Sequence, residues 1–419
     1  MKAKYYDPMF YLTSEEMPFS IRIEVRLKEA VQPAAFKHAV DTAITRYPYF
    51  RMQVVEDAGE LLTVPNERPL AVYEGPQVLP LGSAAVNYHM LAFSYLNTEI
   101  SFHVSHVITD GAGFFPFIKT VLYYYLCEVT GTVLDPKDIR LTDEPFYDDE
   151  LGNPFPEEAM AHAVPLYDKR PEHYFRLTDG GYVNDSKPMV YRFRVNEAAV
   201  FQYNHDNDGS PCSLFSSLMC RAIRALHPDT REDIVSAVSF NQRPGIGNRY
   251  NYRLLCSTIM LTYPERLKNA DTAMLCTCSR GMVSLQSQPE NVLWSVQKRR
   301  ELIESLNRFP DVKGKQEFLS RIALEDSIGC TFSVSYVGRL SIGAVEPYLD
   351  SIYNLTDGST YRSLFIEVSL TNGEFCISFL QGFSSDVYYK AFLQELDGCG
   401  ISYREENVTP LVTAKIELP

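Results

Sequence analysis

The sequence predicts an α/β protein of two similar lobes, each a mixed sheet flanked by helices. In the first half, a strand, a helix, a hairpin and a second helix follow one another between residues 21 and 128. The second half begins in the same order from residue 190, although the sequence itself does not repeat. Residues 135–188, which hold seven prolines, separate the two halves. We therefore expect an N-terminal lobe at 1–135, a crossover segment at 136–188 and a C-terminal lobe at 189–419.

Hydrophobic periodicity predicts the elements of the first half. Residues 21–28 alternate between apolar and polar, which is typical of a strand with one buried face. Apolar residues recur at helical spacing over 36–47, where Pro33 suits the first turn and Pro48 ends the helix. Further strands are expected at 51–55, 61–64, 90–96 and 100–107, and a helix at 114–128.

The second half is predicted in the same way. Asn372-Gly373 between two apolar runs is a strong hairpin signal. Within the crossover segment only a short helix at 157–164 is expected. In the C-terminal lobe we expect strands at 190–195, 234–240, 254–263, 331–337, 363–370 and 374–380, and helices at 197–204, 213–226, 291–307 and 385–396.

The composition disfavours several classes of protein. The 419 residues include 39 Lys and Arg against 53 Asp and Glu, and this net charge of −14 argues against nucleic acid as the main partner. Nine cysteines without a CxxC pair indicate reduced thiols in a reducing compartment. The first ten residues lack the apolar core of a signal peptide, and the most apolar stretch, 114–127, is too short to span a membrane. We therefore expect a cytoplasmic protein without a membrane span.

One short motif carries chemistry. The strand expected at 100–107 leads into His106-Val-Ile-Thr-Asp110-Gly111-Ala-Gly113, and an apolar helix follows. Chance would give HxxxDG only about 0.02 times in a chain of this composition. His106 ends the apolar face of the strand, and an imidazole with an ordinary pKa of about 6.5 suits a general base. Gly111 and Gly113 let the backbone turn sharply and approach a ligand.

The residues alone leave other roles open for this motif. His106 could be an ordinary hydrogen-bonded histidine, and Asp110 could simply cap the next helix. A metal site formed by His103, His106 and Asp110 is disfavoured, because residues 103 and 106 point to opposite faces of a strand. The sequence contains no P-loop, no dinucleotide-binding glycine loop and no GxSxG elbow.

These residues make the sequence resemble the chloramphenicol-acetyltransferase-like (CAT-like) superfamily. That superfamily includes BAHD acyltransferases, alcohol acetyltransferases and the condensation domains of nonribosomal peptide synthetases, and HxxxDG is its shared signature. Three other segments are similar to those of the superfamily: Arg46-Tyr47-Pro48-Tyr49-Phe50-Arg51, Asn241-Gln242-Arg243-Pro244 after a buried strand, and Ser335-Tyr336-Val337-Gly338-Arg339.

The resemblance implies two CAT-like lobes with an active-site tunnel between them. It implies an enzyme that moves an acyl group from acyl-CoA to a small alcohol or amine, with His106 as the general base. Acyl-CoA is then a co-substrate, and no metal or other cofactor is expected. Because one chain supplies both lobes, we expect a monomer.

The resemblance also implies roles for other residues. The motif Asp110 is expected to point away from the substrate and to pair with an arginine of the second half, which fixes the loop that carries His106 and Gly111. Arg243 is the expected partner, with Arg249 and Arg339 as alternatives. Ser335 and Tyr336 are the candidates for the donor that holds the oxyanion.

Three departures from the superfamily's patterns limit the assignment. Ser105 replaces the first histidine of HHxxxDG, which argues against a condensation domain, and the DFGWG motif of the plant enzymes is absent. Tyr336 stands where relatives often carry asparagine. The alternatives are a condensation-type enzyme that acts on carrier-protein thioesters and a non-catalytic binding protein with a CAT-like fold.

Overall fold

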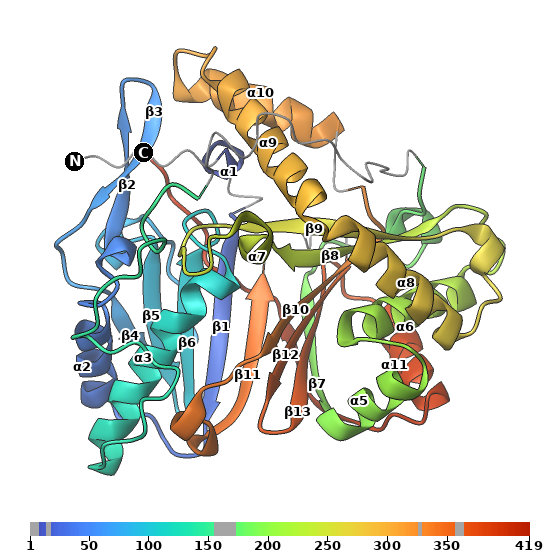
Figure 1. Cartoon of the computed structure of the whole chain (residues 1–419), viewed down its shortest axis with the longest axis horizontal. Coiled ribbons are helices and arrows are strands. Elements are labelled where there is room, and N and C mark those ends of the chain that lie inside the picture. The colour runs from blue at the N-terminus through green and yellow to red at the C-terminus, as the bar shows by residue number, and fades with distance from the viewer. Residues whose placement is uncertain (1–7, 14–17, 155–172, 326–328, 357–363) are drawn as a thin grey trace.

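The protein consists of two lobes that lie side by side, each built on its own sheet (Figure 1). The computed structural model describes residues 8–13, 18–154, 173–325, 329–356 and 364–419. The short helix expected at 157–164 lies outside these residues. Each lobe is a mixed sheet with helices packed against it, as the sequence predicts.

The first lobe is a five-stranded sheet in the order β11-β1-β6-β5-β4. Two helices pack against it through a core that includes Phe36 on the first helix and Val121 on the second. The strands are β1 (Ser20–Leu27), β4 (Val72–Glu74), β5 (Leu91–Leu96), β6 (Glu99–Ser105) and β11 (Leu349–Thr356), and the helices are α2 (Pro33–Ala43) and α3 (Gly111–Thr130). A small separate sheet pairs β2 (Met52–Asp57) with β3 (Glu60–Pro65).

The second lobe is a seven-stranded sheet in the order β14-β7-β13-β12-β10-β8-β9. Its strands are β7 (Met189–Asn196), β8 (Ile234–Asn241), β9 (Cys256–Tyr263), β10 (Phe332–Arg339), β12 (Leu364–Thr371), β13 (Glu374–Gln381) and β14 (Tyr403–Pro410). The helices beside this sheet are α5 (Glu197–Asp206), α6 (Pro211–Leu226), α8 (Thr272–Gln286) and α11 (Val387–Gly398).

The expected boundary would make residues 189–419 a lobe of their own. In the structure, part of this half belongs to the first lobe instead. Strand β11 pairs antiparallel with β1, so that Ile21 lies opposite Thr356. The C-terminal tail also returns to the first lobe, where Leu81 bridges to Ile416 and the Ser20 hydroxyl donates to the Ala414 carbonyl. Strand β1 has an open edge until β11 fills it, which is why the two halves are interleaved.

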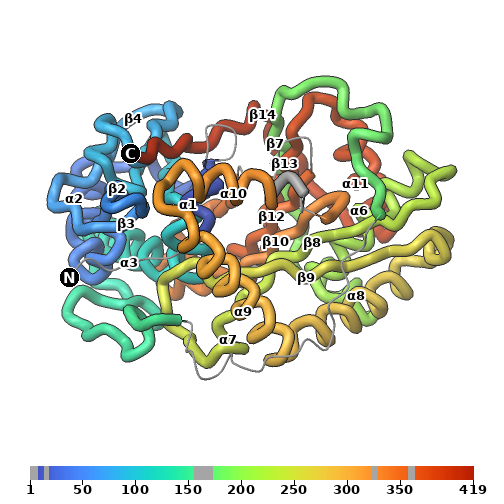
Figure 2. The backbone as a smooth tube through the Cα atoms, turned by 90° about the horizontal axis from the view of Figure 1, so that it is seen from above, coloured from blue at the N-terminus to red at the C-terminus, as the bar shows by residue number. Residues whose placement is uncertain are grey.

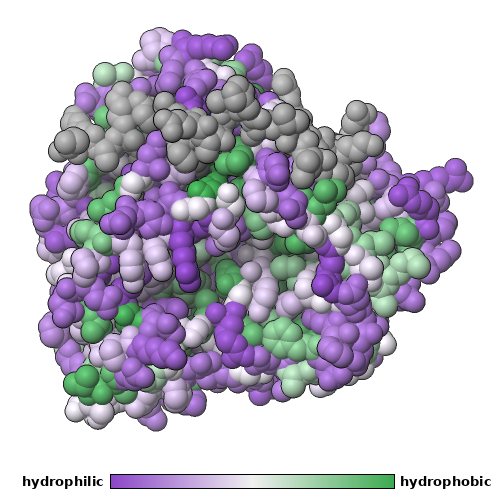
Figure 3. Space-filling view, viewed as in Figure 1, coloured by the Kyte–Doolittle hydropathy of each residue, from purple (hydrophilic) through white to green (hydrophobic). Residues whose placement is uncertain are grey.

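Two helices of the second half span both lobes. Helices α9 (Pro289–Leu306) and α10 (Val312–Glu325) lie across the top of the molecule (Figures 1 and 2). The buried Lys315 of α10 donates to the Gly59 carbonyl in the β2–β3 turn at 2.8 Å. On the face seen in Figure 3, polar side chains predominate and apolar ones show between them near its centre.

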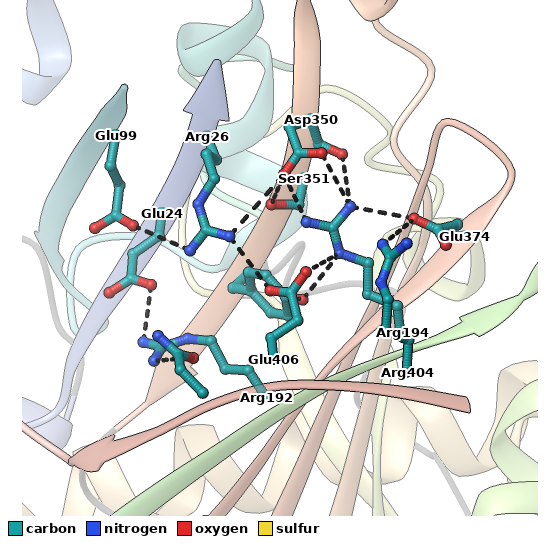
Figure 4. A network of polar contacts seen from close by, with 12 residues as sticks. Glu24, Arg26, Glu99, Arg192, Arg194, Asp350, Ser351, Glu374, Arg404 and Glu406 are labelled. Atoms are coloured by element: carbon teal, nitrogen blue, oxygen red, sulfur yellow. Dashed lines mark hydrogen bonds and ion pairs between the residues drawn. The ribbon is translucent and has the colours of Figure 1, made fainter. Parts of the chain in front are cut away.

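Charged side chains join the two sheets below this region (Figure 4). Arg192 of β7 pairs with Glu24 of β1 at 2.8 Å, and both side chains are buried. Arg194 pairs with Asp350 of β11 and with Glu406 of β14, each at 2.5 Å. Removing one partner from a buried pair leaves an uncompensated charge, so this network opposes separation of the lobes.

The crossover segment is held to the first lobe by a buried ion pair. Arg46 follows α2 and makes two hydrogen bonds of 2.9 Å to Glu150, which is fully buried. The Tyr49 hydroxyl donates to the same carboxylate at 2.6 Å. The segment that resembles the superfamily near residue 46 thus anchors the chain that leads to the second lobe.

Within the part of the chain that the structure describes, none of the helices is both long enough and apolar enough to cross a membrane.

Candidate functional site

His106 stands one residue beyond the end of β6, at the junction of the two lobes. Val104 of the same strand face is fully buried in the first core, whereas His106 is only half-buried. Its backbone N–H donates to the Phe19 carbonyl at 2.6 Å. Phe19 has a φ of +47°, which a bulky residue rarely adopts, so the backbone beside His106 is strained.

The hydrogen bond of the imidazole defines its tautomer. Nδ1 lies 2.9 Å from the Thr109 carbonyl oxygen. A carbonyl can only accept, so Nδ1 carries the hydrogen in the neutral ring. Nε2 therefore keeps its lone pair, which is the arrangement that a general base requires.

Neighbouring groups determine the pKa of His106. Burial lowers the pKa of the ring, but the hydrogen bond and the electrostatic interaction with Cys256, the Thr109 carbonyl and Asp110 together outweigh this and raise the pKa to about 9. Cys256 is the first residue of β9, and no motif in the sequence pointed to it. The raised pKa shows that the surroundings favour the imidazolium that a base forms during reaction.

The Asp110 carboxylate caps a helix and binds an arginine at the same time. It caps α3 by accepting from the Gly113 N–H at 2.9 Å, and it accepts from Leu255 N–H at 2.8 Å. The Arg243 guanidinium binds both of its oxygens, each at 2.9 Å. The predicted pair between Asp110 and Arg243 is therefore present, and the helix cap coexists with it.

Arg243 connects the second lobe to this loop. It begins α7 (Arg243–Ile246) and is 3% exposed. Besides Asp110, it donates to the Asn251 carbonyl at 2.8 Å and to the Arg253 carbonyl at 2.6 Å. Arg339, one of the alternatives, pairs instead with Glu197.

The two glycines of the motif differ in what they do. A Cβ on Gly113 would lie 2.1 Å from the Tyr252 carbonyl oxygen, so no larger residue fits without a shift. A Cβ on Gly111 would meet Val337 of β10 at an ordinary 3.6 Å. Neither has a positive φ. The expectation of a sharp glycine turn is therefore wrong: Gly113 permits close approach of the Tyr252 backbone, and Gly111 is the first residue of α3.

The two oxyanion candidates lie on opposite faces of β10. The Tyr336 ring packs against the second-lobe core, 5.8 Å from the Phe375 ring. Ser335 faces the other way and lies opposite Glu367 of β12 in the parallel register. The structure thus brings Ser335, but not Tyr336, to the side of the sheet that faces the first lobe.

Glu367 is a site residue that sequence reasoning missed. It is 3% exposed and accepts a hydrogen bond of 3.1 Å from Thr356 at the end of β11. Burial raises the pKa of Glu367 to about 7, although hydrogen bonds with Ser335 and Thr356 and the charge of His106 act in the opposite direction. The one available signal was an acid within the apolar run Leu364–Thr371.

His103 does not join this group. Its Nε2 lies 2.9 Å from the Ser94 hydroxyl, and its ring stacks against Tyr73. Burial and the nearby Arg22 charge lower the pKa of His103 to about 3, so the ring is neutral. His103 therefore lies apart from His106, as the alternation of a strand requires. Among the described residues, no three potential ligands of the His, Cys, Asp and Glu types cluster as a metal site.

Comparison with known proteins places this arrangement in a known fold. No family model and no curated protein matches the chain. Solved structures do match over nearly the whole length. The first condensation domain of the CDA synthetase has a TM-score of 0.63 at 12% identity, with 95% of each chain covered.

Two further structures show the same similarity. TRI101 of F. graminearum, solved with coenzyme A and deoxynivalenol, has a TM-score of 0.61 at 12% identity and covers 96% of this chain and 99% of its own. Polyketide synthase associated protein 5 of Mycobacterium tuberculosis has a TM-score of 0.60 at 12% identity, with 94% and 96% covered. At this identity the likeness shows the fold: two α/β lobes arranged as in these proteins.

Proposed function

We propose that the protein is a CoA-dependent acyltransferase that moves an acyl group from acyl-CoA to an alcohol or amine. The observation that carries the proposal is the state of His106. Its Nδ1 is held by the Thr109 carbonyl, its Nε2 has the lone pair in the neutral ring, and the residue is half-buried at the lobe junction. The same fold occurs in a protein solved with coenzyme A, which supports acyl-CoA as the donor.

In the proposed reaction, Nε2 of His106 takes the proton of the acceptor hydroxyl or amine as its oxygen or nitrogen attacks the thioester carbonyl. The tetrahedral intermediate collapses as the carbon–sulfur bond breaks, and the imidazolium returns the proton to the CoA sulfur. General-base assistance is typically worth about 10²–10⁴-fold. The remainder comes from positioning of the two substrates and from the oxyanion donor.

The oxyanion donor proposed here is the Ser335 hydroxyl. It lies on the lobe-facing side of β10 and shares a hydrogen-bonded cluster with Glu367, on which His106 acts electrostatically. Asp110 has a positioning role, because its carboxylate is occupied by Arg243 and by two backbone N–H groups. The substrates are proposed to reach His106 through a tunnel between the lobes, and one chain supplies both sides of it.

The test is release of free thiol. The protein is incubated with acetyl-, butyryl- and octanoyl-CoA and a panel of alcohols and amines, and CoA is followed with a thiol reagent while the product is identified by mass spectrometry. We expect acceptor-dependent CoA release that His106→Ala reduces by 10²-fold or more. A variant that keeps more than about a tenth of the wild-type kcat would show that His106 is not the base.

A second candidate is condensation-type chemistry on carrier-protein thioesters, which the likeness to the condensation domain favours. The same assay separates the two when the acyl group is offered on CoA and on a phosphopantetheinylated carrier protein. Turnover with the carrier alone supports the second candidate. Binding of acyl-CoA without turnover of any acceptor in the panel supports a non-catalytic protein.

A further inference from the structure

The carboxylate of Glu367 is a buried ionisable group of the lobe junction, and the proposed mechanism leaves it without a role. None of the described Arg and Lys side chains forms an ion pair with it, and its side chain is 3% exposed. A buried carboxylate without a cation is costly in its ionised form. A group of this kind at the proposed site of reaction requires a physical explanation.

The strand registers place Glu367 among hydroxyl groups close to His106. On β10, Ser335 lies directly opposite Glu367, and on β13, Ser378 lies directly opposite from the other side. Thr356, which bonds Glu367, ends β11 and faces Ile21 of β1. On the other side of β1, Ile21 faces Val104 of β6, two residues before His106.

The direction of the hydrogen bonds in this cluster depends on whether the Glu367 carboxyl group carries a proton. A serine hydroxyl has one hydrogen to donate. An ionised Glu367 can only accept, so it takes the Thr356 proton and also the Ser335 proton. A protonated Glu367 instead donates to the Ser335 oxygen, and the Ser335 proton is then free for another acceptor.

We propose that Glu367 is a positioning residue that acts as a neutral acid: it donates to Ser335 and so directs the Ser335 hydroxyl at the oxyanion. This inference rests on the proposed function, in which Ser335 holds the tetrahedral intermediate. Thr356 keeps the acid in the required orientation, because its hydroxyl occupies one carboxyl oxygen and leaves the other for Ser335. The reaction itself consumes no proton of Glu367.

The electrostatics of the cluster agree with a neutral acid near neutral pH. Desolvation is the largest influence on Glu367 and raises its pKa to about 7. The groups that act against it are the Ser335 and Thr356 hydroxyls and the charge of His106. The Ser378 hydroxyl is fully buried and has no hydrogen-bond partner among the described residues.

The test compares Glu367→Gln with the wild type from pH 6 to pH 9. Glutamine is neutral at every pH, and its amide nitrogen donates to Ser335 while its oxygen accepts from Thr356. The wild type loses its acid form above pH 7, so the ratio of kcat/KM, variant over wild type, is expected to rise roughly tenfold per pH unit above 7. Titration of the base occurs in both proteins and cancels in this ratio.

A changed pKa of His106 in the variant would not cancel. Glu367 is ionised mainly above pH 7, so the loss of its charge lowers the pKa of the base in that range and also raises the ratio, but only by the factor by which this pKa shifts, about tenfold for one pH unit. A ratio that levels off within about tenfold therefore reports this shift, whereas loss of the acid form makes the ratio rise further up to pH 9. A ratio that stays constant or falls with pH, or a variant inactive throughout the range, overturns the role of Glu367. Ser378→Ala is the matched control, because it removes a neighbouring hydroxyl on the same side of the sheet and should leave the ratio unchanged.

Two measurements separate this inference from the function on which it rests. If Ser335→Ala turns over normally, the oxyanion assignment fails, whatever Glu367 does. If Ser335→Ala loses activity but Glu367→Gln shows no pH-dependent gain, only the role of Glu367 fails. Difference infrared spectroscopy adds a readout without turnover: a carboxylic-acid band should disappear with a midpoint near pH 7 in the wild type and be absent from Glu367→Gln.

Discussion

The ion pair between Asp110 and Arg243 provides a quantitative test of how the two lobes are joined at the site. The perturbations are Asp110→Ala, Arg243→Ala and the double variant. Both side chains are at most 5% exposed, and the guanidinium binds both carboxylate oxygens at 2.9 Å. Removing either partner therefore leaves a buried charge without compensation.

The magnitudes follow from the contacts that each variant loses. Arg243→Ala leaves the Asp110 carboxylate buried and removes the donor to the Asn251 and Arg253 carbonyls, which should cost about 3–5 kcal/mol of unfolding free energy. Asp110→Ala strands the guanidinium at a similar cost and also removes the cap of α3, worth about 1 kcal/mol. The double variant removes both charges, so its cost should be about 1–3 kcal/mol below the sum of the singles.

Urea unfolding followed by circular dichroism measures these costs, and CoA release measures activity in the same proteins. Each single variant should lose stability and also kcat, because the loop that carries His106 is anchored by this pair. Stability losses that simply add in the double variant would refute the reasoning, since they would mean that the two side chains do not interact energetically.

Three further predictions concern single side chains of the site. Ser335→Ala should lower kcat by about 10²–10³-fold with little change in KM. Tyr336→Phe should leave both constants near normal, because its ring faces the second-lobe core. Steady-state kinetics of the two variants tests which hydroxyl is the oxyanion donor. Cys256→Ala should move the ¹⁵N NMR titration midpoint of His106 from about 9 to a lower pH, since the partner that raises this pKa is lost, and an unchanged midpoint would contradict that cause. Gly113→Ala should lower the melting temperature markedly, because the new methyl group would lie 2.1 Å from a carbonyl oxygen; a melting temperature equal to that of the wild type would count against this contact.

Local patterns predicted most of the fold, and they failed where pairing over long distances decides the outcome. The alternation at 21–28 and the Asn372-Gly373 turn are local signals, and β1 and the β12–β13 hairpin lie where they predict. Strand β11 was not predicted, because its sequence mixes polar and apolar residues without a clear period. It is stabilised as a strand by pairing with β1, which is distant in the sequence. Helices α8 and α10 were missed as well; each contains a glycine, Gly281 and Gly314, which weakens the case for a helix.

The candidate site, like the fold, was predicted from local motifs and missed where distant strands decide the arrangement. The HxxxDG motif and the resemblance it carries predicted the Asp110–Arg243 pair, because both partners lie in recognisable segments. The sequence held part of the answer to the choice between Ser335 and Tyr336, since residues 332–336 alternate and place Tyr336 on the face of Phe332 and Val334. Which of the two faces meets the first lobe is decided only by how the sheets pack. Glu367 belongs to no motif, and its position depends on the register of three neighbouring strands.

The pairing of β1 with β11 has a consequence for how the chain is made. About 320 residues separate the end of β1 from the start of β11. At a synthesis rate of roughly 5–20 residues per second, β1 leaves the ribosome some 15–65 s before its partner does. During that interval one edge of β1 is open to wrong partners. Arg22, Glu24 and Arg26 alternate along this strand, and such charges discourage edge-to-edge association. Glu24 and Arg26, which later help to join the lobes, thus also protect the nascent chain from aggregation while the second half is still being synthesised.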